Sequence, residues 1–243
     1  MDTTNNQNIE TKQFLITGSS SGIGLSLTKL ALSKGHKVIG VSKNKFLLEN
    51  KNYRHEIIDQ SQTSQIIALY NQLKEKGLVI DALVLNAGTI SKPCGIDDIT
   101  EESVNKVVDT NLKGTFYYLK YVGQLVKSET GSICLTSSID GVIGEPYGVM
   151  YSATKAGIIS LMQSFARYYG KNGIRVNSIS PGLIDTPMTS ASGELSADTT
   201  DFSIIQRMGK PAEIATSMYF LLSEKSSFIT GQNLIVDGGF VLK

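Results

Sequence analysis

The most informative stretch for the fold is Phe14-Leu15-Ile16-Thr17-Gly18-Ser19-Ser20-Ser21-Gly22-Ile23-Gly24, where a short apolar strand runs directly into a glycine-rich loop. The apolar residues from Leu25 to Leu32 recur with helical spacing, so the loop opens a helix. Glycines let backbone N–H groups approach a pyrophosphate, and the N-terminus of a helix favours its charge. A glycine turn alone is usually structural, but this placement predicts a dinucleotide site. The expected contacts come from Gly18, Ser20, Ser21, Gly22, Ile23 and Gly24.

A second strand at 38–41 ends in Ser42-Lys43-Asn44. This position, about 20 residues beyond the glycines, is where an acidic residue holds the ribose 2′-hydroxyl of NAD or a basic one accepts the 2′-phosphate of NADP. No acidic residue lies between this strand and Glu49, and Ser42 and Lys43 are in place. We therefore predict NADP(H) rather than NAD(H), against the simpler interpretation that Lys43 is a solvated surface residue.

Two further strands are expected at 55–59 and 81–85. The second is nearly all apolar, which is typical of a parallel strand buried on both faces. Asp59 and Gln60, at the end of the first, would border the adenine, or Asp59 would simply cap the following helix. Asn86-Ala87-Gly88 follows the second strand directly and belongs to the same predicted cofactor site.

Tyr151 and Lys155 lie four residues apart in a helical pattern, so they present a phenol and an ammonium on one face. A nearby cation favours the phenolate, which makes a tyrosine a more effective proton donor or base. Ser138 follows the strand expected at 133–136 and can hold a carbonyl oxygen against that phenol. Tyrosine and lysine at this spacing would otherwise be an ordinary helix surface. Asn111, inside the helix expected from Thr100 onward, is a further candidate because a mid-helix asparagine needs a hydrogen-bond partner.

Composition limits the class of partner. The formal net charge is +1, from 23 basic and 22 acidic residues, so no overall electrostatic field attracts the protein to nucleic acid or to a membrane surface. Cys94 and Cys134, the only cysteines, indicate neither a disulfide framework nor a metal site. No apolar run approaches the roughly 18 residues of a membrane span. We expect a cytoplasmic protein with a small-molecule substrate.

The domain organisation is expected to be simple. Residues 1–11 are polar and rich in Asn and Gln, without the features of a secretory signal, and are predicted to be a flexible tail. Residues 12–243 alternate strand and helix patterns and form a single α/β domain. Within it, residues at about 183–207 form a polar stretch that is either a lid over the substrate or a plain surface loop.

Taken in order, these features resemble the short-chain dehydrogenase/reductase family over nearly the whole chain. The matching residues are the 17–24 loop, Asn86-Ala87-Gly88, Asn111, Ser138, Tyr151 with Lys155, Pro181-Gly182 followed by Thr186, and Asp237-Gly238-Gly239. The resemblance implies a Rossmann-type, doubly wound, seven-stranded parallel sheet in the order 3-2-1-4-5-6-7. It also implies a homotetramer or homodimer.

The resemblance also implies a role for each site residue. Tyr151 would exchange a proton with the carbonyl oxygen, and Ser138 would hydrogen-bond that oxygen. Lys155 would bind the nicotinamide ribose, and Asn111 would hold a water that links Lys155 to solvent. The cofactor contacts would be completed by Tyr151 and Lys155 themselves and by Pro181, Gly182, Ile184 and Thr186.

The substrate is left open. The pocket is expected to include Ile90, Ile139, Asp140, Tyr147 and Met188. The layout is similar to that of 3-oxoacyl-carrier-protein reductases, but those enzymes typically carry basic residues just before strand five, where this chain has Ser128-Glu129-Thr130. The substrate is therefore either an acyl thioester or a sugar or polyol whose hydroxyl groups bind Asp140 and Tyr147. Asp140 could instead cap a turn. A non-catalytic nucleotide sensor or scaffold is the alternative from another class.

Overall fold

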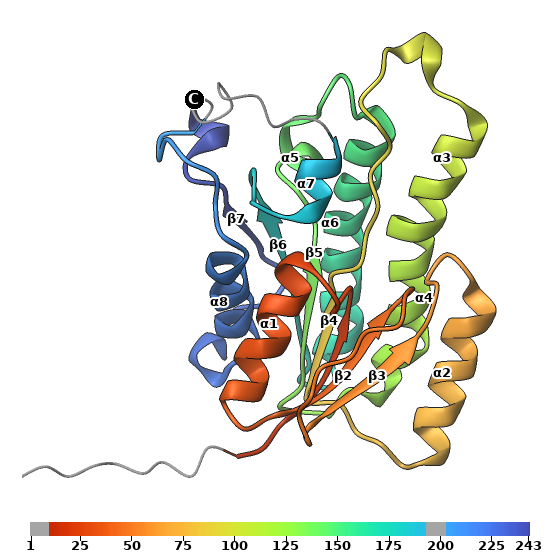
Figure 1. Ribbon diagram of the computed structural model, residues 1–243. Coiled ribbons are helices and arrows are strands. Elements are labelled where there is room, and N and C mark those ends of the chain that lie inside the picture. Colours follow the sequence, from red (N-terminus) through yellow and green to blue (C-terminus); the bar gives the residue numbers. More distant parts are fainter. Residues whose placement is uncertain (1–9, 193–202) are drawn as a thin grey trace, which may run out of the picture.

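The computed structural model describes residues 10–192 and 203–243 (Figure 1). Seven strands, all paired in parallel, form one sheet in the order β3-β2-β1-β4-β5-β6-β7. This confirms the predicted doubly wound sheet. The strands are β1 (Gln13–Thr17), β2 (Lys37–Ser42), β3 (Tyr53–Ile57), β4 (Ala82–Leu85), β5 (Ser132–Thr136), β6 (Arg175–Pro181) and β7 (Asn233–Val236).

The third strand lies two residues earlier than the expected 55–59. Asp59 is outside it because its Oδ1 atom accepts hydrogen bonds from the backbone N–H and the hydroxyl of Ser61, which turn the chain towards the next helix. The alternative that Asp59 caps that helix is wrong, since the N-cap of α2 (Thr63–Glu75) is Gln62.

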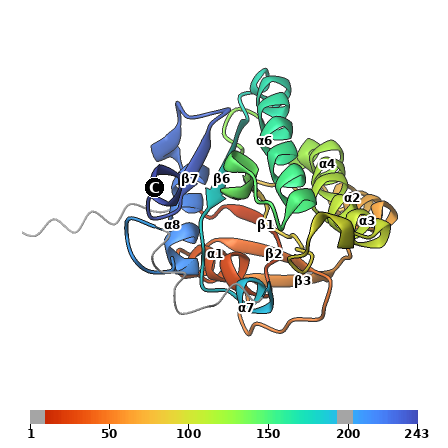
Figure 2. The same ribbon diagram turned by 90° about the horizontal axis from the view of Figure 1, so that it is seen from above.

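Helices cover both faces of the sheet (Figure 2). On one face lie α1 (Gly22–Ser33) and α8 (Pro211–Leu222), and on the other lie α2, α4 (Gly114–Lys120) and α6 (Val149–Gly170). Two apolar cores result, one between each helix layer and the sheet. Because helices cover both faces of the sheet, a ligand-binding site has to lie among the loops at the ends of the strands.

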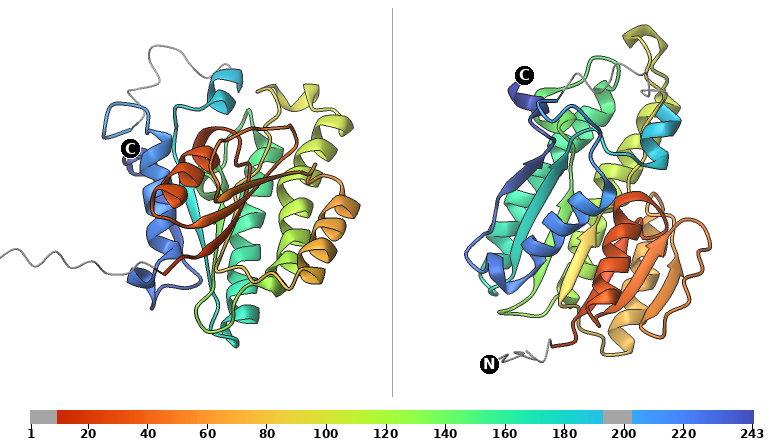
Figure 3. Two further views of the ribbon diagram at one scale, coloured as in Figure 1. Left: turned by 60° about the horizontal axis from the view of Figure 1, so that its bottom comes forward. Right: turned by 60° about the vertical axis from the view of Figure 1, so that its left-hand side comes forward.

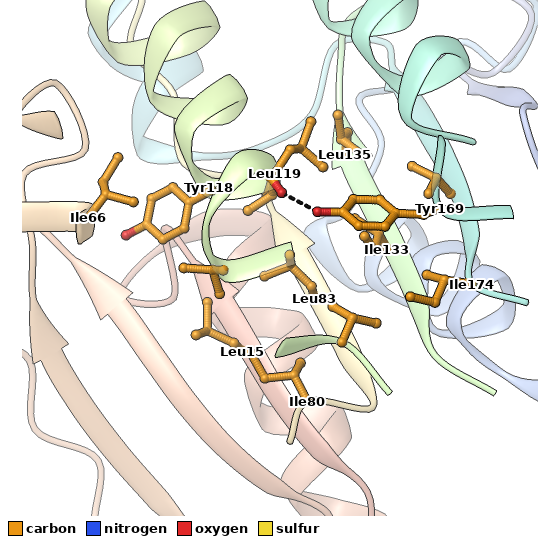
Figure 4. Packing of buried hydrophobic residues seen from close by; sticks show 14 of the residues in the cluster. Leu15, Ile66, Ile80, Leu83, Tyr118, Leu119, Ile133, Leu135, Tyr169 and Ile174 are labelled. Atoms are coloured by element: carbon orange, nitrogen blue, oxygen red, sulfur yellow. Dashed lines mark hydrogen bonds between the residues drawn. The ribbon is translucent and has the colours of Figure 1, made fainter. Parts of the chain in front are cut away.

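The period-two alternation of a strand assigns side chains to these two cores. Leu15, Leu83 and Ile133 point to the α2/α4/α6 side, where Figure 4 shows them packed with Tyr118, Leu119 and Tyr169. The hydroxyl of Tyr169 donates to the carbonyl oxygen of Leu119 at 2.6 Å, which satisfies a buried polar group. Phe14, Val84 and Cys134 point to the α1/α8 side. Burial raises the pKa of the Cys134 thiol to about 12, so this cysteine packs as a small hydrophobe.

The helix expected from Thr100 begins as predicted but is not continuous. The hydroxyl of Thr100 accepts a hydrogen bond from the Ser103 N–H and caps α3 (Glu101–Val107). A π-helical segment, Val108–Lys113, then joins α3 to α4. Asn111 lies in this segment, and such insertions often occur at functional sites.

Short elements gather at the carboxyl end of the sheet. There α5 (Asp140–Ile143), α7 (Pro187–Ser192) and the 3₁₀ turn Phe240–Leu242 lie close above the strands (Figures 1 and 3). Further 3₁₀ turns in the described part of the chain are Ile96–Asp98, Val122–Leu125 and Glu224–Ser226. No helix in the described ranges is long and apolar enough to span a membrane.

The fold predicts opposite effects for two helical glycines. A Cβ atom at Gly24 would overlap the carbonyl oxygen of Gly18 and lie 2.7 Å from Asn86 Nδ2, whereas one at Gly170 would meet nothing within 4 Å. We expect Gly24→Ala to lower the free energy of unfolding by about 1–3 kcal/mol through overpacking. The control Gly170→Ala should be neutral or stabilising, because alanine is the better helix former. Urea unfolding of the three proteins measures this, and equal midpoints would contradict it.

Candidate active site

The site lies where the strand order reverses. β1 pairs with β2 on one side and with β4 on the other, so the connections that leave β1 and β4 diverge to opposite faces. A crevice opens at such a switch point, outside the carboxyl ends of the strands. Here it is a cleft of about 630 Å³.

The cleft collects the predicted cofactor residues. It is lined by Gly18, Ser20, Ser21, Gly22, Ile23, Ser42, Lys43, Asp59, Gln60, Asn86, Ala87, Gly88, Tyr151, Lys155, Pro181, Gly182, Ile184 and Thr186. Gly24 is not among the lining residues: it is buried against Gly18 and Asn86, so it packs α1 against the loops. Its contact with the cofactor stays a prediction.

The glycine loop suits a pyrophosphate. Gly18 and Gly22 have φ angles of +68° and +49°, which side chains rarely adopt. The Ser21 side chain does not cap α1, and the first turn of α1 has no acidic residue. The N–H groups of this turn therefore remain available to an anion. A Cβ atom at Gly22 would lie 3.3 Å from Thr186 Cγ2, so the lack of a side chain at Gly22 also leaves room for Thr186 beside the loop.

At the far end of the cleft, Lys43 Nζ forms an ion pair with Asp59 Oδ2 at 2.7 Å. Burial opposes ionisation of Asp59, but hydrogen bonds from Lys43 and Ser61 outweigh it, so the pKa of this carboxyl lies below its ordinary value. The sequence placed Lys43 and Asp59 in one site but did not indicate that they pair with each other.

Gln60 and Thr17 tie the loops of the site together. Gln60 Nε2 donates to the carbonyl oxygens of Ala87, at 3.0 Å, and Thr110, at 2.7 Å. Thr17 Oγ1 accepts hydrogen bonds from the N–H groups of Asn86 and Ala87, each at 3.0 Å. Sequence reasoning assigned no role to the Thr17 side chain. Only its place at the end of the first strand could have indicated one.

Ser138, Tyr151 and Lys155 come together beneath a second cavity. Ser138 Oγ accepts a hydrogen bond from the Asp140 N–H at 3.2 Å, which leaves its own hydrogen to donate. Lys155 Nζ donates to the carbonyl oxygen of Thr136 at 2.8 Å and lies 5.4 Å from the centre of the Tyr151 ring. Ser138 and Tyr151 line both the cleft and the second cavity. These two hydroxyls therefore stand where a nucleotide and a substrate would meet.

Burial changes the electrostatics of the lysine. The Lys155 side chain is almost inaccessible to solvent. Burial lowers the pKa of Lys155 from 10.5 to about 8, and the negative charge of Asp140 partly opposes this. Near neutral pH the ammonium form still prevails, so Tyr151 keeps a cation beside its ring.

Asn111 has the partners that a buried asparagine requires. Its Oδ1 atom accepts from the Thr89 N–H at 2.8 Å, and its Nδ2 atom donates to the Thr89 carbonyl at 2.9 Å. A Cβ atom at Gly88 would lie 3.3 Å from Asn111 Oδ1 and 3.6 Å from Lys155 Nζ, so the Gly88 backbone lies beside both. Asn111 does not line the cleft, and its link to Lys155 through a water stays a prediction.

The second cavity, of about 360 Å³, contains the predicted substrate residues Ile90, Ile139, Asp140, Tyr147 and Met188. The cavity is also lined by Ser91, Pro93, Glu145, Leu183 and Thr189, which lie in the segments expected around these residues, and by Phe240, which sequence reasoning missed. Phe240 comes from the C-terminal end of the chain, and no local pattern places it here. Of the expected lid at 183–207, α7 brings Met188 and Thr189 to the cavity, and residues 193–202 lie outside the described ranges.

Within the described ranges, no group of three His, Cys, Asp or Glu side chains could hold a metal ion. The polar groups of the cleft fit a dinucleotide instead: a glycine cradle, a helix N-terminus, and hydroxyl and amide side chains along the walls.

Comparison with known proteins agrees with this fold. A family model described as enoyl-(acyl carrier protein) reductase matches residues 18–241. The 3-oxoacyl-[acyl-carrier-protein] reductase FabG of Thermotoga maritima is 35% identical over 245 residues, which cover 96% of this chain and 99% of that protein.

Two solved structures are similar throughout. Aldohexose dehydrogenase from Thermoplasma acidophilum has a TM-score of 0.85 and 31% identity, and the match covers 96% of this chain and 95% of that chain. A short-chain dehydrogenase from Leptospira borgpetersenii with bound NAD+ has a TM-score of 0.85 and 31% identity, with 95% and 92% covered. The chain thus belongs to the short-chain dehydrogenase/reductase family. It is an oxidoreductase that uses a nicotinamide cofactor on a small molecule, as the sequence predicted.

The depressed pKa of Lys155 predicts a pH-dependent stability. The folded state disfavours the ammonium form of Lys155, and this lowers the free energy of unfolding of the wild type by its full amount below pH 8. The free energy of unfolding then rises between pH 8 and 10.5, because the folded protein loses the proton before the unfolded chain does. The stability of Lys155→Met relative to the wild type should therefore fall over this window, by at most about 1.4 kcal/mol per pH unit. Urea unfolding between pH 7 and 10 measures it. Lys76→Met, at an exposed position, is the control for the replacement of a lysine by methionine, and a flat difference for Lys155→Met would refute the prediction.

Proposed function

We propose that this protein interconverts a ketone and a secondary alcohol by hydride transfer, with Tyr151 as general acid or base. The observation that carries the proposal is the position of Ser138, Tyr151 and Lys155. The first two line both the nucleotide cleft and the adjoining cavity, and the buried Lys155 ammonium lies against the Tyr151 ring.

A bound nicotinamide would supply or accept the hydride, and the residues of the chain handle the proton and the geometry. Ser138 has a hydrogen to donate, because its oxygen already accepts from the Asp140 N–H, so it can hold the carbonyl oxygen. Tyr151 gives its phenolic proton to that oxygen in reduction and takes it back in oxidation. The Lys155 charge stabilises the phenolate that reduction leaves behind.

After reduction, the phenolate of Tyr151 must be reprotonated from solvent, and the route would pass Lys155 and Asn111. Asn111 is buried next to Lys155 across the Gly88 backbone, and the π-helical segment holds it there. We propose that Asn111 helps to hold a water that connects Lys155 to solvent.

Tyr151→Phe removes only the phenolic hydroxyl. We expect it to retain nucleotide binding and to lose turnover by about 100- to 10,000-fold, the usual worth of a positioned general acid. Reduced-nicotinamide absorbance measures turnover, and fluorescence titration measures binding. Tyr168→Phe is the matched control, since Tyr168 is an exposed tyrosine further along α6. Wild-type-like turnover in Tyr151→Phe would sink the mechanism.

For the cofactor, we propose a preference for NADP(H). Lys43 lines the cleft at the end of β2, and its side chain is largely exposed, so it can reach a 2′-phosphate. Asp59 already pairs with this lysine, so a phosphate would have to share Lys43 with a carboxylate. The preference would therefore be weaker than an unpaired lysine would provide.

This balance can be tested at both partners. Asp59→Asn removes the competing carboxylate and should lower the dissociation constant of NADPH several-fold while NADH changes little. Lys43→Met should weaken NADPH more than NADH. Lys76→Met, at the end of α2, is the control. Fluorescence titration of each variant with both nucleotides gives the constants, and parallel shifts for NADPH and NADH would contradict the proposal.

Two substrate classes have support. Similarity to a 3-oxoacyl-[acyl-carrier-protein] reductase favours an acyl thioester. Similarity to an aldohexose dehydrogenase, together with Asp140 and Tyr147 in the cavity, favours a sugar or polyol. Assays with acetoacetyl thioesters and with keto-sugars would separate them. Nucleotide binding without turnover on either class, in both directions, would support the sensor or scaffold alternative.

We also propose a homotetramer or homodimer in the cytoplasm, which the family resemblance favours.

A further inference from the structure

The second cavity has an uneven distribution of charge. Its described lining includes two carboxylate side chains, Asp140 and Glu145, and contains no Lys, Arg or His. The rest of the polar lining consists of hydroxyl groups, including those of Ser138, Tyr147 and Tyr151. A cavity with acceptors and hydroxyls but no cation favours donors and disfavours anions.

Asp140 stands close to the reacting groups. It is the first residue of α5, two positions after Ser138, and its backbone N–H donates to Ser138 Oγ at 3.2 Å. Its negative charge also acts on the buried ammonium of Lys155, whose pKa it raises. A substrate held by Ser138 and Tyr151 therefore has the Asp140 carboxylate among its nearest charged neighbours.

Glu145 lines the same cavity on the side of Tyr147. Its Oε1 atom accepts a hydrogen bond from the backbone N–H of Tyr147 at 3.1 Å. The Tyr147 side chain is 62% exposed, so this side of the cavity faces solvent. Water and salt screen charges there, and Glu145 has no contact with Ser138 comparable to that of Asp140, so we expect its effect on a ligand to be smaller.

Lys155 does not cancel this negative charge for a ligand in the cavity. It lines the nucleotide cleft and not the second cavity, and its ammonium donates to the Thr136 carbonyl. The apolar lining, which includes Ile90, Ile139, Met188 and Phe240, can cover the carbon skeleton of a small substrate.

We infer that the substrate is an uncharged ketone or secondary alcohol that carries further hydroxyl groups, and that Asp140 sets this preference by accepting hydroxyl hydrogen bonds and repelling anions. The inference rests on the proposed function, since it names the substrate class of that same site. The enzyme should therefore prefer a small hydroxylated ketone or alcohol to keto acids and to other anionic carbonyl compounds.

Three ketones of nearly equal size test it: 1-hydroxybutan-2-one, pentan-3-one and 2-oxobutanoate, which place a hydroxyl, a methyl or a carboxylate at comparable positions. Their intrinsic reactivities differ, so the informative quantity is how Asp140→Asn changes the ratios of kcat/KM. We expect the ratio of 2-oxobutanoate to pentan-3-one to rise about tenfold, and that of 1-hydroxybutan-2-one to pentan-3-one to fall several-fold.

A purely structural role for Asp140, or an effect only through Lys155, would change all three ketones alike and leave the ratios unmoved, which would overturn the inference. Glu145→Gln should shift the ratios in the same directions by less, and it provides the test if Asp140→Asn does not fold. Glu75→Gln, an exposed carboxylate at the end of α2, is the control and should leave them unchanged.

Binding separates this inference from the proposed function. Calorimetric titration of the enzyme saturated with NADP+ reads the affinity of 1-hydroxybutan-2-one and 2-oxobutanoate without turnover. Tighter binding of the hydroxyketone, reversed or levelled by Asp140→Asn, supports the inference even if no ketone is reduced, in which case only the proposed function fails. Tighter binding of the keto acid by the wild type overturns the inference, whatever the turnover.

Discussion

The site depends on the junction between β1 and β4, where the direction of the chain connections reverses. Thr17 Oγ1 accepts from the N–H groups of Asn86 and Ala87, which joins the loop after β1 to the loop after β4. Gly24 packs against Gly18 and Asn86 at the same place, with no room for a side chain. Because these loops form one wall of the cleft, their mutual position decides whether a dinucleotide fits.

The second constraint is the burial of a charged lysine. Placing Lys155 in the interior costs free energy, as its lowered pKa indicates, and the Thr136 carbonyl, the nearby Asp140 charge and the Tyr151 ring offset part of that cost. Under the proposed mechanism the buried charge has a use, because a cation beside the Tyr151 ring would stabilise the phenolate near neutral pH. In this chain Asp140 connects the two cavities, since it lines one and acts electrostatically on a residue of the other.

Much of the fold was predictable because its signals are local. Apolar runs followed by glycine or polar residues located the strands, and the helical spacing of Tyr151 and Lys155 placed two site residues on one face. Local signals were weaker where partners are distant in sequence. The third strand was expected at 55–59 but ends at Ile57, because Asp59 bonds to Ser61 and Lys43. The close packing of Gly24 against Gly18 and Asn86 likewise has no local signal, because Asn86 is distant in sequence.

By itself, the sequence determined the alternation of strands and helices, the anion cradle after the first strand, and the residue types that can transfer a proton. These follow from periodicity and side-chain chemistry within a few residues of one another. Only the tertiary structure decided that Lys43 pairs with Asp59, that Gln60 spans Ala87 and Thr110, and that Phe240 lines the same cavity as Asp140. Such contacts join segments far apart in the chain, and their geometry exists only once the sheet brings the strand ends together.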